Sequence, residues 1–250
     1  MQDGKTVTTG LVLRVTETKE TDKILTVLTP DRGKIPLIAR GARRKNSRIA
    51  AACQLLAYSE LTLYRRGSWF LLDEASTVEL FDGVRRDIVL LALASYFAEL
   101  TEAVCPEETA APELLSLLLN ALYALCYLDR EARLVKAAYQ LRLLALAGFE
   151  PLASSCAVCG RPEPEAPMLD VVHGVVHCGG CKRQGGLSMP LTAAGLAALR
   201  HILYCDSKKL YSFTLEETAL RELDHAGEAF AASQLERSFR TLDYYKALLG

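Results

Sequence analysis

Two Cys-x2-Cys pairs, Cys156-Ala-Val-Cys159 and Cys178-Gly-Gly-Cys181, are separated by the eighteen residues 160–177. Each pair can direct two sulfurs at one point about 2.3 Å away, and two pairs complete a tetrahedron around Zn²⁺. The glycines that follow or fill the pairs allow the tight backbone of such turns. Between the pairs, Asp170-Val-Val-His-Gly-Val-Val-His177 predicts two short strands that turn near Gly174. The segment is therefore predicted to be a small zinc ribbon.

Disulfides and a redox motif are the alternatives for these cysteines. Two disulfides need an oxidising compartment, and a redox Cys-x-x-Cys is normally a single motif after a strand. His173 and His177 could replace a thiolate as metal ligand. Because four thiolates already complete the ligand shell, we expect both histidines at the surface or around the ligands instead. With four protein ligands no position remains for water, and we expect one structural Zn²⁺ per chain.

The charge is unevenly distributed along a chain of 250 residues whose net charge is −1 and of which half is apolar. Residues 1–80 carry thirteen Lys and Arg against nine Asp and Glu, whereas residues 81–250 carry sixteen against twenty-one. The length allows one large domain or two smaller ones. A basic front part suggests one surface for polyanions and another for a different partner.

The N-terminus, Met-Gln-Asp-Gly-Lys, has no apolar segment typical of a signal peptide, so we expect a chain that is not exported. The uncharged run at residues 114–128 has fifteen residues and is too short to span a bilayer. The other cysteines, Cys53, Cys105, Cys126 and Cys205, occur singly in apolar surroundings and are expected to be buried thiols. These features predict a cytoplasmic protein without membrane attachment.

Residues 5–80 predict strands at 6–16, 23–29, 34–40, 56–65 and 69–80. The Pro30-Asp-Arg-Gly33 turn between two apolar runs is typical of a hairpin. Five short strands in about 75 residues favour a small closed barrel of the OB type, with an SH3-like barrel as the competing fold. The barrel could also serve as a scaffold only.

The segment Arg40–Arg48 between the third and fourth predicted strands has five basic residues among nine and no acidic one. Such a run is usually a solvated surface, but beside an OB barrel it favours nucleic-acid binding. Tyr64, Trp69 and Phe70 could stack on bases, although core packing explains strand aromatics equally well, and Trp69 is the best exposed candidate. The predicted nucleic-acid contacts are Lys34, Arg40, Arg43, Arg44, Lys45, Arg48, Arg65, Arg66 and Trp69.

A helical period begins near residue 84 and predicts helices over 87–104, 112–128 and 130–147, the last with Asp129 as its N-cap. After the cysteine segment, Thr192 and Thr214 are the predicted N-caps of two further helices, and a final helix is expected over 233–249. The fold class is therefore α+β. The predicted segments are an OB-type barrel (1–81), a helical domain (82–150), a zinc ribbon inserted into it (151–190) and the rest of the helical domain (191–250).

Enzyme motifs are absent from the sequence. There is no Gly-x4-Gly-Lys-Ser/Thr phosphate loop, no Gly-x-Ser-x-Gly elbow and no His-Glu-x-x-His. No pair of acidic residues indicates a two-metal nuclease. We therefore expect a protein that is not an enzyme.

Three stretches together resemble the RecO family of bacterial DNA repair proteins. They are Ala39-Arg-Gly-Ala-Arg-Arg-Lys-Asn-Ser47, Ala94-Ser-Tyr-Phe-Ala-Glu-Leu100, and Leu143-Leu-Ala-Leu-Ala-Gly-Phe-Glu-Pro151 leading into Cys156-x-x-Cys-Gly. The resemblance covers nearly the whole chain, in the same order. The basic loop and the Gly-Phe-Glu-Pro segment are its specific parts.

The resemblance implies a recombination mediator associated with the nucleoid. Proteins of this family bind single- and double-stranded DNA, anneal complementary strands, act with RecR and the tail of the single-strand-binding protein, and help to load RecA. By position, the DNA contacts would be Arg40, Arg43, Arg44, Lys45 and Arg48, and the zinc ligands Cys156, Cys159, Cys178 and Cys181. A pocket for the acidic tail would need a local basic spot, for which Arg130, Arg133 and Arg142 are the candidates.

Three other classes of protein remain open from the residues alone. An OB barrel with a zinc ribbon also suits an RNA-binding protein of translation or transcription. A nuclease or nucleotide-transfer enzyme would need a catalytic site that the motifs do not reveal. A protein adaptor would use the helices and leave nucleic acid uncontacted.

Overall fold

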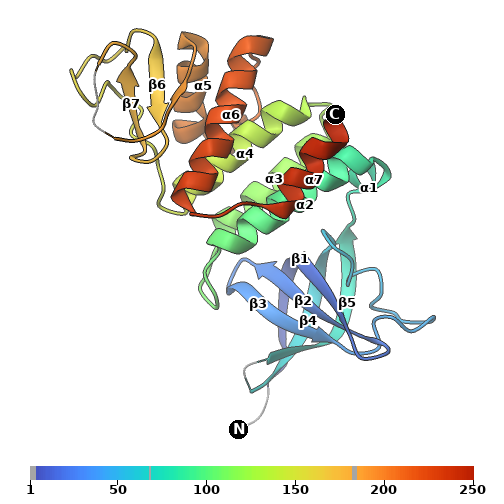
Figure 1. The fold of residues 1–250 in the computed structure, drawn as a ribbon. Coiled ribbons are helices and arrows are strands. Elements are labelled where there is room, and N and C mark those ends of the chain that lie inside the picture. Colours follow the sequence, from blue (N-terminus) through green and yellow to red (C-terminus); the bar gives the residue numbers. More distant parts are fainter. Residues whose placement is uncertain (1–3, 68, 182–184) are drawn as a thin grey trace. The chain divides into compact units, whose positions relative to one another are not determined.

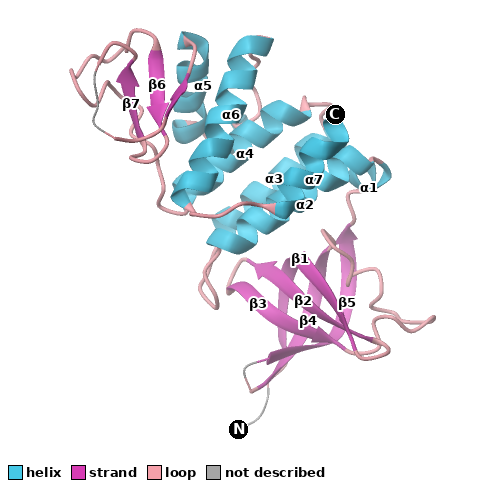
Figure 2. Ribbon diagram, in the orientation of Figure 1, coloured by secondary structure: helices cyan, strands magenta, loops and turns pink. Residues whose placement is uncertain are grey.

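The computed structural model of the chain describes residues 4–67, 69–181 and 185–250. Its contacts divide the chain into two compact units, Met1–Tyr127 with Arg240–Gly250, and Leu128–Phe239. Figures 1 and 2 show N-terminal strands followed by helices, and a small sheet that lies in the sequence between α4 (Ala132–Leu146) and α5 (Ala193–Tyr204). The segment boundaries at 81, 150 and 190 stay a prediction, and the compact units pair the last helix with the N-terminal part of the chain.

The first unit contains a closed five-stranded barrel. Its strands are β1 (Thr6–Thr18), β2 (Asp22–Thr29), β3 (Gly33–Ala39), β4 (Tyr58–Arg66) and β5 (Trp69–Glu79). The order around the barrel is β1-β2-β3-β5-β4, and β4 pairs with β1. Among the described strand pairs of the barrel, β3 and β5 form the parallel one, through Leu37↔Phe70 and Ile38↔Leu71. This is the Greek-key connection of the OB fold, so the predicted barrel type is confirmed.

Alternating side chains fill the barrel. In β3, the buried residues Ile35, Leu37 and Ala39 alternate with half-buried ones, as expected for a strand with one face in a core. The strands β1 and β2 differ, because Gly10–Leu13 and Leu25–Thr29 are buried without interruption. Helices α2 (Ile88–Val104) and α3 (Pro112–Tyr127) pack on their outer side and cover the second face.

Two further helices complete the first unit, α1 (Asp82–Arg86) and α7 (Arg240–Leu249). Helix α2 begins one residue later than predicted, because the Asp87 carboxylate is the N-cap and accepts hydrogen bonds from Val89 N and Leu90 N. Helix α7 packs on α2, and Glu99 Oε2 accepts a hydrogen bond from Thr241 N at 3.1 Å. The prediction of one helix over 233–249 is wrong, since Glu236 has a positive φ of 49° that interrupts it.

The second unit is built on α4 (Ala132–Leu146), α5 (Ala193–Tyr204) and α6 (Glu217–Gln234), with a 3₁₀ turn at Ser207–Lys209. The predicted cap at Thr192 is confirmed, since its hydroxyl accepts a hydrogen bond from Gly195 N at 2.9 Å. The caps predicted at Asp129 and Thr214 are wrong. Asp129 has a positive φ of 48° before the helix begins, and α6 begins after Glu216 without a side-chain cap.

A three-stranded sheet carries the cysteine segment. Strands β6 (Pro167–Asp170) and β7 (Val175–Cys178) form the predicted hairpin, with Gly174 at a φ of 63° in its turn. A third strand, β8 (Ser188–Pro190), pairs with the other edge of β6 and was not predicted. Among the described residues, no helix combines the length and the apolar character needed to cross a membrane.

Candidate metal centre and nucleic-acid interface

The four cysteine sulfurs all lie within 4.8 Å of one another. Cys156 Sγ is 3.9 Å from Cys181 Sγ, and Cys159 Sγ is 3.8 Å from Cys178 Sγ. A tetrahedron with metal–sulfur bonds of about 2.3 Å has sulfur–sulfur edges of about 3.8 Å. A disulfide would need about 2.05 Å, and all four cysteines are free thiols. The geometry therefore fits one metal ion bound by four thiolates.

Backbone N–H groups also favour a thiolate at Cys156. Cys159 N and Cys178 N donate hydrogen bonds to Cys156 Sγ at 3.5 and 3.4 Å. Burial raises the pKa of the Cys156 thiol, but these hydrogen bonds outweigh it and bring the pKa to about 6. Burial and the neighbouring thiols raise the pKa of Cys181 to about 12. Thiolates this close repel one another, so a cation is the group that would keep all four deprotonated.

The two nearby histidines have partners outside the cluster. His177 is buried, with Nδ1 2.9 Å from Cys178 O and Nε2 2.8 Å from Ser188 Oγ. His173 Nδ1 lies 2.8 Å from the buried carboxylate of Asp170. Burial raises the pKa of Asp170, but hydrogen bonds from His173 lower it more, so the carboxylate stays ionised. Both histidines support the β6–β7 hairpin, and the cluster that could hold a metal consists of the four cysteines.

The basic loop, Arg40–Arg48, is exposed at all five of its basic side chains and anchored beneath them. Ala42 is buried in the barrel core. Asp22 Oδ1 accepts a hydrogen bond from Gly41 N at 2.8 Å, and Arg43 N donates to Thr21 O at 2.9 Å. Lys23 Nζ donates to Cys53 O at 3.0 Å and fastens the end of the same β3–β4 connection. The cations are therefore presented on a backbone fixed to the β1–β2 turn.

One of these cations is partly neutralised. Arg43 Nη2 lies 3.1 Å from Glu17 Oε2, and its Nη1 donates to Glu20 O at 3.4 Å. Sequence reasoning missed this β1–β2 turn and the anchoring role of Asp22. The sequence signal for this role is an acidic residue at the start of a strand, next to a short turn. Its partner, Gly41, lies nineteen residues further along the chain, so the signal does not identify the contact.

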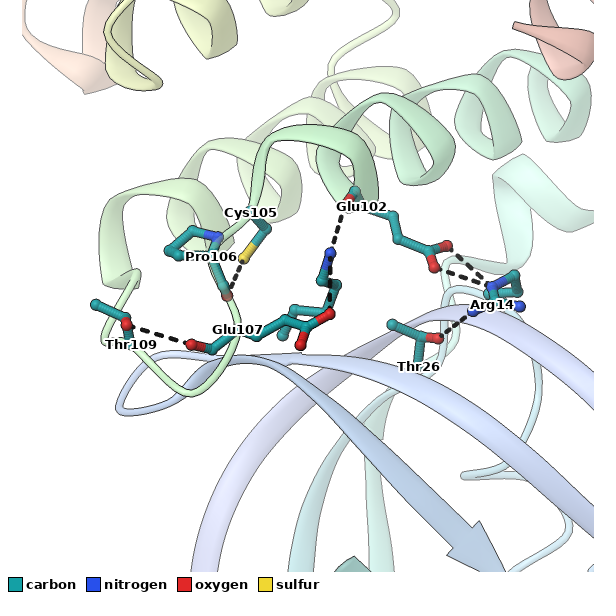
Figure 3. A network of polar contacts seen from close by, with 8 residues as sticks. Arg14, Thr26, Glu102, Cys105, Pro106, Glu107 and Thr109 are labelled. Carbon is teal, nitrogen blue, oxygen red and sulfur yellow. Dashed lines mark hydrogen bonds and ion pairs between the residues drawn. The ribbon is translucent and has the colours of Figure 1, made fainter. Parts of the chain in front are cut away.

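Lys34 does not lie with the loop, but beside the contacts between Arg14 and Glu102 that Figure 3 shows. Its Nζ donates to Glu102 O in the last turn of α2 at 3.0 Å and lies 3.9 Å from Glu107 Oε1. A cation is favoured at the C-terminal end of a helix, where carbonyl groups lack partners. Next to it, Arg14 Nε lies 2.9 Å from Glu102 Oε1 and Arg14 Nη2 donates to Thr26 Oγ1 at 3.2 Å. Lys34 thus connects β3 to α2.

The remaining predicted contacts lie around the β4–β5 turn, in a group that we call the turn end: Arg65, Arg66 and Trp69. All three are exposed, and Trp69 is 38% exposed. Arg65 Nη1 and Nη2 bind both carboxylate oxygens of Glu108 at 3.0 and 3.1 Å. Of the other two aromatic candidates, Phe70 is buried and Tyr64 half-buried, so Trp69 is confirmed as the exposed one. Sequence reasoning did not name Glu108 among the candidate residues.

The fold and the cysteine cluster define a class of protein, an OB-type barrel joined to helices that carry a candidate metal-binding ribbon. Comparison with known proteins narrows this class. Residues 1–81 match the family model described as "Recombination protein O N terminal", and residues 85–243 match "Recombination protein O C terminal". The chain belongs to the RecO family of DNA repair proteins.

Individual relatives align along most of the chain. The DNA repair protein RecO of Acetivibrio thermocellus is 30% identical over 241 residues, or 96% of each chain. That of Anaeromyxobacter dehalogenans is 35% identical over 248 residues, or 97% of each chain. That of Heliobacterium modesticaldum is 36% identical over 221 residues, which cover 86% of this chain and 79% of the relative. The similarity therefore includes the barrel, the helices and the cysteine segment.

Proposed function

We propose that this protein is a DNA-binding recombination mediator that binds single- and double-stranded DNA and anneals complementary strands. The observation that carries the proposal is the basic loop, with five exposed cations on an anchored backbone beside an OB-type barrel. The proposed contacts are Arg40, Arg43, Arg44, Lys45 and Arg48. Lys34 is left out of this surface because α2 holds its ammonium group. Membership of a DNA repair family supports DNA as the polyanion.

The proposed mechanism requires no bond chemistry. Basic side chains replace the cations condensed on the phosphates, and the release of these counterions drives binding. Neutralised strands repel each other less, which favours their pairing. Phosphate contacts position a strand without reading its sequence, so we expect little sequence preference. The protein would then be a mediator and not an enzyme.

Membership of the family supports a proposal for the partners and the location. We propose that the protein acts in the cytoplasm at the nucleoid, with RecR and the tail of the single-strand-binding protein, and helps to load RecA. Of the candidate residues for the acidic tail, Arg142 donates to Cys205 O and other carbonyls at the end of α5, and Arg133 pairs with Glu217. Arg130 is half-buried and is the remaining candidate.

We also propose Zn²⁺ as the ion of the four-cysteine cluster. Four thiolates at tetrahedral spacing are the preferred ligand set of structural zinc. Bound there, zinc would hold the turn at Cys156–Cys159 against the end of β7. All four positions would be taken by protein, so its contribution would be to folding.

The proposed DNA surface is tested by the salt dependence of single-strand binding, measured by fluorescence anisotropy. If five side chains each neutralise one phosphate, log K against log salt should slope by roughly −3.5. The Arg43→Ala/Arg44→Ala/Lys45→Ala variant should bind more weakly, with a slope of roughly −1.4. The matched control, Lys208→Ala/Lys209→Ala/Arg221→Ala, removes three exposed cations from the other unit and should leave the slope unchanged.

An unchanged slope in the loop variant would contradict the assignment of the loop. Single-stranded RNA of matched sequence serves as a second ligand in the same titration. Equal affinity for RNA and DNA, without annealing of complementary DNA strands, would favour an RNA-binding protein instead.

A further inference from the structure

Two buried residues of the first unit have backbone angles that large side chains rarely adopt. Leu56, two residues before β4, has a φ of 61°, and Phe81, two residues after β5, has a φ of 54°. Both side chains are buried. In this left-handed region the Cβ atom lies too close to a backbone oxygen, so the conformation is unfavourable for a large residue. Such residues persist only where the surrounding structure holds them, and they occur often at functional sites.

One side chain holds the carbonyl group in front of each of these two residues. Arg85, on α1, donates through Nε to Leu80 O and through Nη2 to Leu55 O. Its third nitrogen, Nη1, lies 3.2 Å from Gln54 Oε1. A guanidinium presents its donors in a rigid planar fork, so it fixes two acceptors relative to each other. Arg85 therefore joins the end of the β3–β4 connection to the segment between β5 and α1.

The β3–β4 connection is also the segment that contains the basic loop. Short-range backbone hydrogen bonds follow one another along it, from Arg44 N to Gly41 O, Ser47 N to Arg44 O, Ala50 N to Ser47 O, Cys53 N to Ile49 O and Ala57 N to Gln54 O. Asp22 fixes the start of the connection through Gly41 N. Near its end, Leu56 N donates to Val12 O at 2.9 Å. Arg85 contacts the connection next to this end, so a change at Arg85 reaches the backbone that carries the cations.

Helix α3 holds the segment between β5 and α1 as well. Glu79 Oε1 accepts hydrogen bonds from Leu80 N at 2.8 Å and from Phe81 N at 2.7 Å. Its other oxygen, Oε2, accepts a hydrogen bond at 3.0 Å from the hydroxyl of Tyr127, at the end of α3. The backbone on which Arg85 bears is therefore fixed to a second helix.

The contacts of Arg85 favour support of the loop over contact with phosphate. Arg85 is half-buried, and its three guanidinium nitrogens all donate to oxygen atoms of the protein. Its neighbour Arg86 is exposed. A polyanion that bound α1 directly would contact the exposed Arg86 more readily than Arg85. Since the two neighbours carry the same charge, a comparison of their variants separates support from charge.

We propose that Arg85 is a positioning residue for nucleic-acid binding, which fixes the end of the β3–β4 connection and so orders the basic loop before a strand binds. The proposal rests on the proposed function, because the basic loop is the surface that Arg85 positions. A loop that is ordered in advance loses less conformational freedom on binding. A variant without this support should bind more weakly at every salt concentration and still neutralise the same number of phosphates.

The test measures binding of labelled oligo-dT by fluorescence anisotropy at three salt concentrations. We expect Arg85→Ala to bind at least about fivefold more weakly than the wild type, with an unchanged slope of log K against log salt. Arg85→Lys keeps the charge but lacks the planar fork that fixes two carbonyl groups, so it should still lose about threefold or more. The matched control, Arg86→Ala, removes the same charge one residue further on and should bind within about twofold of the wild type.

Hydrogen exchange measures the support of the loop directly. In both Arg85 variants the Leu56 N–H should exchange at least about tenfold faster, because the end of the connection opens more often. The amides of Ile35 and Leu37 in β3 should keep their protection, which shows that the barrel is folded. Arg86→Ala should exchange as the wild type does at all three positions.

Each other outcome overturns the role of Arg85. A slope that becomes shallower by about 0.7 in Arg85→Ala, with normal binding by Arg85→Lys, would mean direct contact with one phosphate. Wild-type binding by both variants, or unchanged exchange at Leu56, would mean that the loop does not depend on this contact. Loss of β3 protection in both variants would make Arg85 a residue of the barrel fold.

The same titrations separate this proposal from the proposed function. A wild type that does not bind oligo-dT, or that binds it independently of Arg43, Arg44 and Lys45, overturns the proposed surface together with the role of Arg85. A wild type that binds through the basic loop, with undiminished binding by both Arg85 variants, overturns only the role of Arg85.

Discussion

Asp22 Oδ1 accepts a hydrogen bond at 2.8 Å from the backbone N–H of Gly41, at the base of the basic loop. This hydrogen bond from Gly41 is the main cause that lowers the pKa of Asp22, and Lys19 and Arg40 lower it further. Gly41 has a φ of 65°, a conformation that glycine adopts without strain. An acidic side chain thus lies within a surface that is proposed to bind polyanions. The position of Asp22 is explained if its hydrogen bond with Gly41 fixes the conformation of the basic loop.

Replacements at Asp22 distinguish its charge from its role as an acceptor. Asp22→Ala removes both, and the freed loop must be ordered on binding, so we expect single-strand affinity to fall about three- to tenfold. Asp22→Asn keeps an oxygen acceptor and removes a negative charge, so its affinity should equal or exceed that of the wild type. Anisotropy titrations at one salt concentration measure both. Tighter binding by Asp22→Ala would show that the carboxylate acts through its charge alone.

Gly33 is the second position where a turn requires glycine. It has a φ of 56°, and a Cβ atom there would lie 2.3 Å from Thr109 O and 2.7 Å from Pro106 O. Gly33→Ala should lower the free energy of unfolding by more than about 2 kcal/mol, since strain of about 1–2 kcal/mol adds to the clash. Gly67→Ala is the control, because Gly67 has a φ of 64° but no atom within 4 Å of its Cβ position. Denaturant unfolding should show the smaller loss for Gly67→Ala; equal losses would mean that the clash relaxes freely.

The barrel was predictable because its signals are local. Strand alternation in β3, the turn at Pro30–Gly33 and the spacing of five apolar runs are all contained in short windows. The cysteine spacing is equally local, and the four sulfurs meet as predicted. The sequence also predicts the exposure of the basic loop, since it carries no apolar stripe. In contrast, β8 has three residues, and the second cysteine pair lies between it and its partner β6 in the sequence. No local pattern therefore predicts β8.

The partners of the predicted contacts outside the basic loop were not predictable. Arg65 and Arg66 have the same chemistry as the basic loop, but they end β4 beside the β4–β5 turn, where Arg65 binds Glu108. The partners of Lys34 and Arg65 come from Glu102, Glu107 and Glu108, more than forty residues away. Such pairings depend on how α2 packs against the barrel, which periodicity alone does not fix.

A buried ion cluster in the second unit should control stability. Lys136 on α4 is 2% exposed, and its Nζ lies 3.0 Å from Asp224 Oδ2 on α6 and also contacts Glu228. Lys136→Met would remove this cation from the buried carboxylate of Asp224 and the half-buried carboxylate of Glu228. We expect a loss of about 3–5 kcal/mol in the free energy of unfolding, as for other broken buried pairs. Lys246→Met, on α7, is the exposed control. Thermal unfolding measures both, and a loss below about 1 kcal/mol in Lys136→Met would contradict the role of the pair.

The same cluster predicts a pH dependence. Burial raises the pKa of Asp224 from 3.8 to about 6, although Lys136 opposes the shift, with Arg133 and Glu228 as the other charges nearby. The folded state therefore holds this proton more tightly than the unfolded state. The contribution of Asp224 to stability is present below about pH 4 and is lost as the pH rises through about 6. In Asp224→Asn this decline should disappear, whereas the exposed control Glu236→Gln should keep it. Equal pH profiles for all three proteins between pH 4 and 7 would contradict the assignment.

Metal removal should unfold the cysteine segment before the barrel. The strands β6, β7 and β8 have four, four and three residues, which is too little for a sheet of this size to be stable without a staple. Metal analysis should give about one Zn²⁺ per chain, and a chelator should make residues 151–190 sensitive to protease while residues 6–79 stay protected. Cys159→Ser should reproduce this effect, because it removes one of the four sulfurs. Cys205→Ser, outside the cluster, is the control and should not. A metal-free protein whose cysteine segment resists protease as well as the wild type would contradict a structural metal.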